Sequence, residues 1–299
     1  MFIPAYLKLP KNDMKGKVRQ AEEILKSCTL CPRNCLADRT AGIMGFCRTG
    51  SKPYVSSYNA HFGEEAPLVG QKGSGTVFFT HCNLGCIFCQ NYSISHLGEG
   101  REISFKALAD IMLALQGYGC HNINFVTPTH QVPMILRSLE IAIDKGLKIP
   151  LVYNSGGYES VETLRVLEGV IDIYMPDFKF ADPEAARKYA QAIDYPEVAK
   201  AAIKEMHRQV GDLVTDDMGI GLRGLLVRHL VLPEGLAGTE EIVRFISEEI
   251  SPYTYTNIMA QYHPSYKAAG CPPLDRRITA EEYRKAVNAA KEAGLKRLD

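Results

Sequence analysis

The 299-residue sequence has no tryptophan, no long apolar run and no excess of charge of either sign. The missing tryptophan excludes no function. No apolar run approaches the roughly 18–20 residues that a membrane-spanning helix needs, so we expect no membrane association. Lysine and arginine together (34) balance aspartate and glutamate (34), whereas nucleic-acid-binding proteins usually carry a basic excess. The residues from Met1 to Tyr6 lack the charged and apolar regions of a secretory signal, which predicts a cytoplasmic protein.

Cysteine, by contrast, is present in a pattern that indicates chemistry. Seven of the nine cysteines form a group of four and a group of three: Cys28, Cys31, Cys35 and Cys47, then Cys82, Cys86 and Cys89. An odd number of cysteines in a reducing cytosol argues against a disulfide framework, and close clustering there usually means metal binding. Cys120 and Cys271 have no cysteine nearby in the sequence, so we expect them to be ordinary thiols.

Most of the chain alternates short apolar runs with segments of helical periodicity. Six runs are predicted strands: 76–80, 122–127, 149–153, 171–175, 225–232 and 257–262. Helices are expected at 15–27, after the N-cap candidates Ser104, Asp182 and Thr239, between Pro133 and Gly146, and after a capping box that begins at Thr279. Strands that alternate with helices indicate an α/β fold with a parallel sheet, in which ligand sites gather at the carboxyl ends of the strands.

The three-cysteine group directly follows the first predicted strand, in the segment THCNLGCIFCQN at 80–91. Three thiolates spaced C-x3-C-x2-C can bind three irons of a [4Fe–4S] cluster and leave the fourth iron open for another ligand. They cannot complete a four-thiolate zinc site without a distant partner. The alternative is a zinc knuckle completed by Cys120 or His81.

This segment resembles the radical S-adenosylmethionine (SAM) superfamily, whose defining motif is C-x3-C-x2-C with an aromatic residue, here Phe88, before the last cysteine. The resemblance implies that the amino and carboxylate groups of SAM chelate the open iron. One electron then cleaves SAM to methionine and a 5′-deoxyadenosyl radical, which abstracts a hydrogen atom from the substrate. In this reading Cys82, Cys86 and Cys89 are both metal ligands and catalytic residues.

From residue 28 to about residue 266, the sequence looks like the pyruvate formate-lyase activating enzyme-related proteins. The stretches that carry this likeness are CTLCPR at 28–33, HFGEE at 61–65, NFVTPTH at 124–130, PDFK at 176–179, VRHLVLP at 227–233 and MAQY at 259–262. The fold expected from this likeness is a partial (β/α)6 barrel of the TIM-barrel kind. We assign residues 1–70 to an N-terminal four-cysteine metal-binding module, 71–270 to the barrel and 271–299 to a C-terminal helical extension.

The likeness also implies cofactor-binding roles for residues at the predicted strand ends. Asn91 matches an activase asparagine near SAM, and Thr127 and Thr129 replace a Gly-Gly-Glu element that holds its amino group. Asn154 and Ser155 stand where activases have Asp-Thr, which weakens the case for a monovalent cation beside Asp177. Lys179 matches an activase lysine that contacts the methionyl end of SAM or the substrate backbone. Arg228 matches an activase arginine that reaches the SAM carboxylate. Because Arg228 and His229 alternate along a strand, we expect Arg228 to face the barrel interior.

The four-cysteine group is a complete ligand set for one metal centre. Four thiolates can bind one tetrahedral zinc ion, and the same four can hold an auxiliary [4Fe–4S] cluster with no open iron. The spacing of Cys28, Cys31, Cys35 and Cys47 does not separate these two alternatives.

The expected activity is hydrogen abstraction from a substrate, with a glycine of a glycyl radical enzyme as the activase-like target. One alternative is a radical SAM enzyme that modifies another peptide or a small molecule. An alternative from another class is a non-catalytic iron–sulfur or zinc scaffold. The chemistry implies a low-potential electron donor, flavodoxin or ferredoxin, and the specificity of such folds lies in loops that sequence analogy describes least well.

Overall fold

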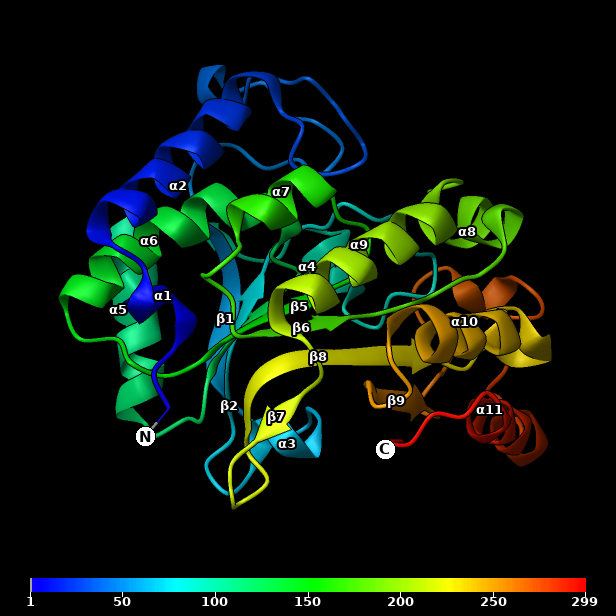
Figure 1. Cartoon of the computed structure of the whole chain (residues 1–299). Coiled ribbons are helices and arrows are strands. Elements are labelled where there is room, and N and C mark those ends of the chain that lie inside the picture. Colours follow the sequence, from blue (N-terminus) through cyan, green and yellow to red (C-terminus); the bar gives the residue numbers. More distant parts are fainter. Residues whose placement is uncertain (1) are drawn as a thin grey trace.

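The structure, a computed structural model, describes residues 2–299 and is built on a mixed β-sheet (Figure 1). The strand order is β3-β1-β2-β4-β5-β6-β8-β7, and β9 pairs with the second half of β8. Six strands run parallel to one another, and each overlaps the range predicted for it: β2 (Ser74–Phe79), β4 (Ile123–Val126), β5 (Leu151–Ser155), β6 (Ile173–Pro176), β8 (Gly221–Leu230) and β9 (Tyr255–Met259).

Three further strands run antiparallel to their neighbours and were not predicted. They are β1 (Tyr54–His61), β3 (Arg101–Glu102) and β7 (Val214–Thr215). Strand β1 pairs with β2, so part of the predicted N-terminal module contributes to the main sheet. The polar sequence of β1, YVSSYNAH, explains why it was missed, since only one of its eight residues, Val55, is buried.

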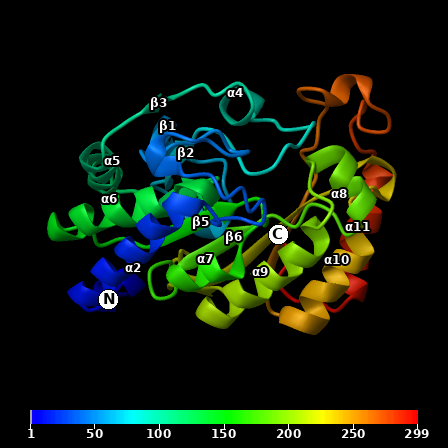
Figure 2. The same ribbon diagram turned by 90° about the horizontal axis from the view of Figure 1, so that it is seen from above.

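The longer helices cover the outer face of the sheet. They are α5 (Phe105–Gly117), α6 (Val132–Asp144), α7 (Val161–Val166), α8 (Pro183–Ala190), α9 (Tyr195–Val210) and α10 (Thr239–Phe245), whereas α11 (Ala280–Glu292) packs on α10. Helix α2 (Lys11–Ile24) packs on the outside of α6 and α7 (Figure 2). Short helices α1 (Ala5–Lys8), α3 (Ala66–Val69) and α4 (Tyr92–Ser95) lie in the connections. Single turns complete the chain at Leu25–Ser27, Arg39–Ala41, Thr129–Gln131, Pro233–Gly235, Ile246–Ile250 and Ala268–Gly270. Within residues 2–299, no helix combines the length and the apolar character required to cross a membrane.

Helix starts follow the capping pattern of the sequence, with one exception. Ser104 and Asp182 accept backbone N–H bonds at the starts of α5 and α8, and Thr279 forms the capping box of α11 with Glu282. The prediction for Thr239 was wrong. Gly238, in a left-handed conformation, occupies the N-cap of α10, and the Thr239 hydroxyl instead hydrogen-bonds the ring of His229.

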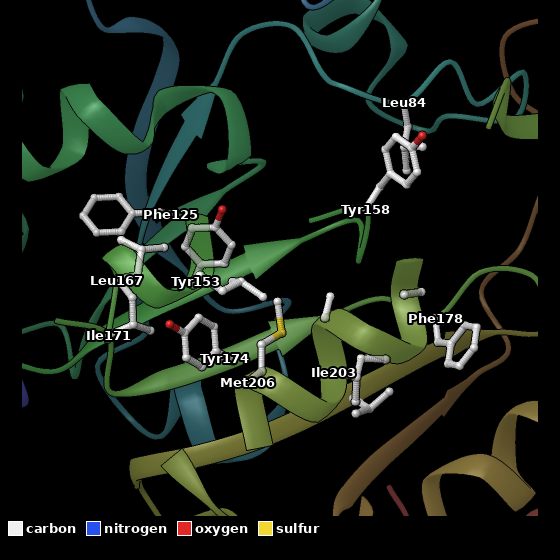
Figure 3. Close-up of a cluster of buried hydrophobic side chains, with 14 of the residues drawn as sticks. Leu84, Phe125, Tyr153, Tyr158, Leu167, Ile171, Tyr174, Phe178, Ile203 and Met206 are labelled. Atoms are coloured by element: carbon white, nitrogen blue, oxygen red, sulfur yellow. The ribbon is translucent and has the colours of Figure 1, made fainter. Parts of the chain in front are cut away.

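Side chains of the parallel strands alternate between two cores. Phe125, Tyr153 and Tyr174 point toward the helices and pack in the outer core, as Figure 3 shows. Their neighbours in sequence point the other way, into the barrel. There the fully buried Leu68 of α3 packs in a second core with Val152, Ile173, Met175, Leu213 and Leu226. Helix α3 therefore plugs the barrel interior from below the site described next.

Replacing Leu68 by alanine tests this plug. Leu68→Ala is expected to lower the free energy of unfolding by about 2–5 kcal/mol, because it leaves a cavity inside the barrel. Urea unfolding monitored by circular dichroism measures the loss. The matched control is Leu97→Ala, at a side chain that is 63 % exposed, where a change within about 0.5 kcal/mol is expected. Equal effects of the two substitutions would contradict the plug.

Candidate active site at the carboxyl ends of the strands

A cavity of about 270 Å³ opens at the carboxyl ends of the parallel strands. The three-cysteine group and most of the residues with a predicted cofactor role line it together: Cys82, Cys86, Cys89, Phe88, Asn91, Thr127, Asn154, Ser155, Asp177, Lys179 and Arg228. A larger hollow of about 810 Å³ lies along α11, but no cysteine borders it, and all but one of its charged side chains are carboxylates. The smaller cavity is therefore the candidate site, because it gathers thiols, cations and amides at one place.

The cysteine loop between β2 and α4 is held from outside by main-chain bonds. The amides of Gly85 and Ile87 donate to the carbonyls of Ala190 and Tyr189, and the Ile87 carbonyl accepts from the amide of Lys267. A Cβ at Gly85 would lie 2.6 Å from the Gln191 side chain, so the loop packs tightly against the residue that follows α8. These contacts orient the three thiols toward the cavity rather than toward solvent.

The donor set at the loop fits an iron–sulfur cluster. Burial raises the pKa of the Cys82 and Cys86 thiols to about 12, and the nearby Lys179 ammonium opposes that rise. Both thiols therefore stay protonated until a metal replaces the protons. Among residues 2–299, no three His, Cys, Asp or Glu side chains converge on the position of a single metal ion. The fit rests on three thiols that share the wall of one cavity beside a cation.

Opposite the cysteine loop lies a buried network of charged side chains. The Asp177 carboxylate accepts from Arg228 Nε at 2.8 Å through Oδ1 and from Lys179 Nζ at 2.6 Å through Oδ2. Arg228 Nη2 donates to Asn154 Oδ1 at 2.8 Å. Burial alone would raise the pKa of Asp177, but Arg228 and Lys179 outweigh it and hold the pKa below its usual value. Asp177 is the carboxylate for which the likeness to activases suggested a monovalent cation. In this structure both of its oxygens accept hydrogen bonds from protein cations.

Two further carboxylates below this network received no role from the sequence. Arg228 Nη1 lies 3.3 Å from Glu64 Oε2 and 3.8 Å from Glu65 Oε1, and Asn257 donates to Glu65. Burial raises the pKa of Glu64 to about 7, with Glu65 and Asp177 adding to the rise against Arg228. Both glutamates lie in the HFGEE stretch at 61–65, between β1 and the plug helix α3. That stretch carried a family likeness, but only the packing of α3 inside the barrel brings it to Arg228.

The two threonines predicted to bind the cofactor lie in different places. Thr127 borders the cavity in a left-handed conformation, with φ of 57°, and its amide donates to the Asn154 carbonyl. Such strain in a residue other than glycine is typical of functional sites. Thr129 is fully buried away from the cavity wall, and its hydroxyl donates to Glu159 at 2.6 Å. The geometry therefore brings Thr127, and not Thr129, to the site.

The other predicted cofactor contacts border the cavity in distinct ways. The Phe88 ring packs edge-on against Phe180 and Tyr262, which anchors the last turn of the cysteine loop. Asn91 is exposed at the start of α4, on the rim, and Ser155 is buried at the end of β5. Further residues on the wall had no predicted role, among them Gln90, Ser95, His96, Leu230, Met259 and Gln261.

The four-cysteine group also borders one cavity, although its thiols do not converge on the position of a single metal ion. Cys28, Cys31, Cys35 and Cys47 all border a second cavity, of about 10 Å³, together with Arg33 and Arg39. This cavity lies next to the active-site loop. The Arg33 side chain donates to the Asn83 carbonyl at 2.9 Å, and Asn83 in turn donates to the carbonyl of Tyr158. Figure 3 shows the Tyr158 ring beside Leu84 of the same loop.

The chain forms a partly closed barrel of parallel strands. Three cysteines follow the first parallel strand, and cations lie at the later strand ends. Together these features define the class to which this site belongs. Residues 76–231, about half of the chain, match the family model of the radical SAM superfamily. The chain belongs to this superfamily, and a [4Fe–4S] cluster and SAM are the cofactors that the family implies.

Two comparisons with individual proteins accompany the family match. The chain is 36 % identical over 289 residues to the uncharacterized protein MJ0674 of Methanocaldococcus jannaschii, covering 93 % of this chain and 78 % of that protein. It also aligns with the crystal structure of methylornithine synthase (PylB), with 13 % sequence identity and a TM-score of 0.45 over 98 % of this chain and 83 % of that one.

Arg228 can be tested as the centre of the buried charge network. Arg228→Met is expected to lower the free energy of unfolding by about 3–5 kcal/mol, because it leaves buried carboxylates without their cation. Adding Glu64→Gln in the same chain should recover part of the loss by removing one of those charges. Urea unfolding at pH 8, above the pKa of Glu64, measures both. A double variant no more stable than Arg228→Met would contradict the proposed charge coupling.

His229 points to the outer core and makes stability depend on pH. Burial lowers its pKa to about 4, while the Phe178 carbonyl opposes the shift. Well above pH 6.5, His229 is neutral in both the folded and the unfolded chain, and its full contribution to the free energy of unfolding is present. As the pH falls below 6.5 the unfolded chain takes up a proton first, so wild type should lose about 2 kcal/mol relative to His229→Gln between pH 7.5 and pH 5. Urea unfolding at both pH values checks this, and a pH-independent difference would contradict it.

Proposed function

We propose that this chain binds a [4Fe–4S] cluster through Cys82, Cys86 and Cys89, cleaves SAM reductively and abstracts hydrogen from a substrate. The observation that carries the proposal is the shared cavity, which sets three thiols opposite the Asn154, Asp177, Lys179 and Arg228 network. Bound together, the cluster and SAM supply a one-electron cleavage that yields methionine and the hydrogen-abstracting 5′-deoxyadenosyl radical.

The chain's own residues bind and orient SAM in this proposal. Lys179 and Arg228 present cations on the cavity wall to the methionyl carboxylate, and the planar guanidinium of Arg228 suits two-point binding. Asp177 keeps both cations in place through its two oxygens. Asn154, Ser155 and Thr127 offer amide, hydroxyl and carbonyl groups at two adjoining strand ends for the amino group and the nucleoside.

We propose a glycine of a partner polypeptide as the hydrogen donor, in line with the likeness to activating enzymes. The cavity size supports a donor of this kind. At about 270 Å³, it lies just below the range of roughly 300–1,000 Å³ that encloses one drug-sized ligand, so SAM takes up most of it. The substrate then reaches the radical through the open mouth near Gln90, Asn91 and Gln261, as an extended loop can do.

The remaining parts of the proposal concern partners and organisation. A flavodoxin or ferredoxin supplies the electron, and a second metal occupies the four-cysteine site of the N-terminal region. Residues 1–70, 71–270 and 271–299 are proposed as the metal-binding module, the catalytic barrel and the helical extension, in a cytoplasmic enzyme.

Replacing one cluster ligand separates an enzyme from a scaffold. Cys86→Ala is expected to abolish the dithionite-driven release of 5′-deoxyadenosine from SAM, because the three-thiolate set is broken. Chromatographic quantification of 5′-deoxyadenosine in anaerobically reconstituted protein is the measurement. The control is Cys271→Ala, outside both cysteine groups, which should retain release. If wild type with its cluster in place releases none, and Cys86→Ala changes stability alone, the scaffold interpretation replaces the proposed function.

A further inference from the structure

We propose that Cys28, Cys31, Cys35 and Cys47 bind a second [4Fe–4S] cluster, fully ligated by protein, whose negative charge is balanced by Arg33 and Arg39. This inference concerns a separate site and does not depend on SAM cleavage at the first. Three observations support the inference. The four thiols border one cavity without converging on a single metal position, two guanidinium groups border the same cavity, and hydrogen bonds join this segment to the active-site loop.

Within residues 2–299, no three cysteines lie where they could share one metal ion, so the four thiols are spaced too widely for a single zinc ion. All four cysteines border a cavity of about 10 Å³, which admits about one water-sized sphere. Four thiolates at about 2.3 Å from a shared zinc ion stand about 3.8 Å from one another and leave no such room. In a [4Fe–4S] cluster each thiolate binds a different iron, so the four thiolates stand farther apart. The spacing in this structure therefore favours the cluster.

The segment around the cavity is closely packed, so this width is not the result of a loose loop. Asp38 caps the turn Arg39–Ala41 by accepting the amides of Thr40 and Ala41. The amide of Cys28 donates to Ala37, and that of Leu36 donates back to Cys28. A side chain at Gly45 would lie 2.7 Å from the sulfur of Cys35, so the chain passes as close to this thiol as glycine permits.

Arg39 supplies a buried positive charge at this site. Its side chain is 1 % exposed, and it donates to the carbonyls of Gly50 and His130 while Nη1 lies 3.9 Å from the Cys28 sulfur. Within residues 2–299, no carboxylate forms an ion pair with it. A buried cation without an anion is strongly unfavourable. A cluster with four thiolate ligands is anionic and provides the missing partner.

Arg33 lies between this site and the active-site loop. Its Nη2 atom is buried without a hydrogen-bond partner, whereas Nε donates to the Asn83 carbonyl of the cysteine loop. The unpartnered N–H groups of Nη2, at a residue that borders the cavity, suit the sulfur atoms of a cluster as acceptors. A second link runs from Arg48, next to Cys47, to the His96 carbonyl, and the His96 ring contacts the Cys86 carbonyl. The proposed cluster is thus coupled to the backbone around the catalytic cysteines.

The test removes the catalytic cysteines and keeps the four-cysteine site. The full-length triple variant Cys82→Ala/Cys86→Ala/Cys89→Ala, reconstituted anaerobically with iron and sulfide, should retain about four irons and four sulfides per chain. After dithionite reduction its electron paramagnetic resonance spectrum should not change on adding SAM, because no iron is left open. Cys35→Ala in the otherwise intact chain should lose about half of the iron, whereas Cys271→Ala should lose none.

One zinc per chain, or no metal, in a folded triple variant would overturn the proposal. Folding is checked by size-exclusion chromatography and thermal unfolding. If the triple variant does not fold, Cys35→Ala decides, since an unchanged iron content there also overturns the proposal. Failure of SAM cleavage in wild-type protein would affect the proposed function alone, because these metal contents do not depend on it.

The role of Arg39 has its own spectroscopic readout. Arg39→Gln removes the positive charge and should shift the reduction potential of the second cluster to more negative values in the triple variant. Arg39→Lys restores the charge and should return the potential toward that of the parent. A merely structural role would lower cluster content in both variants without shifting the potential, and would contradict the charge-balancing role.

Discussion

The ion pair between Asp177 and Arg228 organises the candidate site, because it joins the ends of two neighbouring strands inside the barrel. The backbones of these residues also pair at this point. Around the pair, Lys179 shares Asp177, Asn154 shares Arg228, and Glu64 and Glu65 approach from the plug helix. Buried charges of this kind are tolerated only where every partner is in place. The strand ends, the plug and the cavity wall therefore depend on one another.

The cysteine loop is the second fixed part of the site, and the chain holds it from three directions. The end of α8 and Lys267 bond its main chain from outside, Phe88 anchors it in the aromatic core, and Arg33 connects it to the four-cysteine segment. Such support holds the three thiols at the wall of one cavity. It also means that the N-terminal segment belongs physically to the active site.

Much of the site was predictable because the relevant side chains follow directly from strand ends. In parallel sheets those ends lie along one edge, so Cys82, Thr127, Asn154, Asp177 and Arg228 were expected to meet. Alternation along β8 likewise predicted that Arg228 faces the barrel interior, where it borders the cavity. The structure decided the position of His229, which is buried and hydrogen-bonds Phe178 and Thr239. Glu64 and Glu65 were not predictable in this way, since they follow an antiparallel strand that the sequence pattern did not show. The sequence predicted a cofactor role for Thr129, but this residue begins the helical turn Thr129–Gln131 and is fully buried.

The sequence by itself determined the superfamily, the six parallel strands and the two groups of thiols, because local spacing and periodicity encode these features. Tertiary structure decided which buried charges meet. Arg228 faces carboxylates that lie 51, 163 and 164 positions away, and such distant partners leave no periodic trace. Tertiary structure likewise brings the four N-terminal cysteines to the wall of one cavity. Spacing along the chain sets how many ligands there are, whereas only the packed loop sets how far apart their sulfur atoms lie.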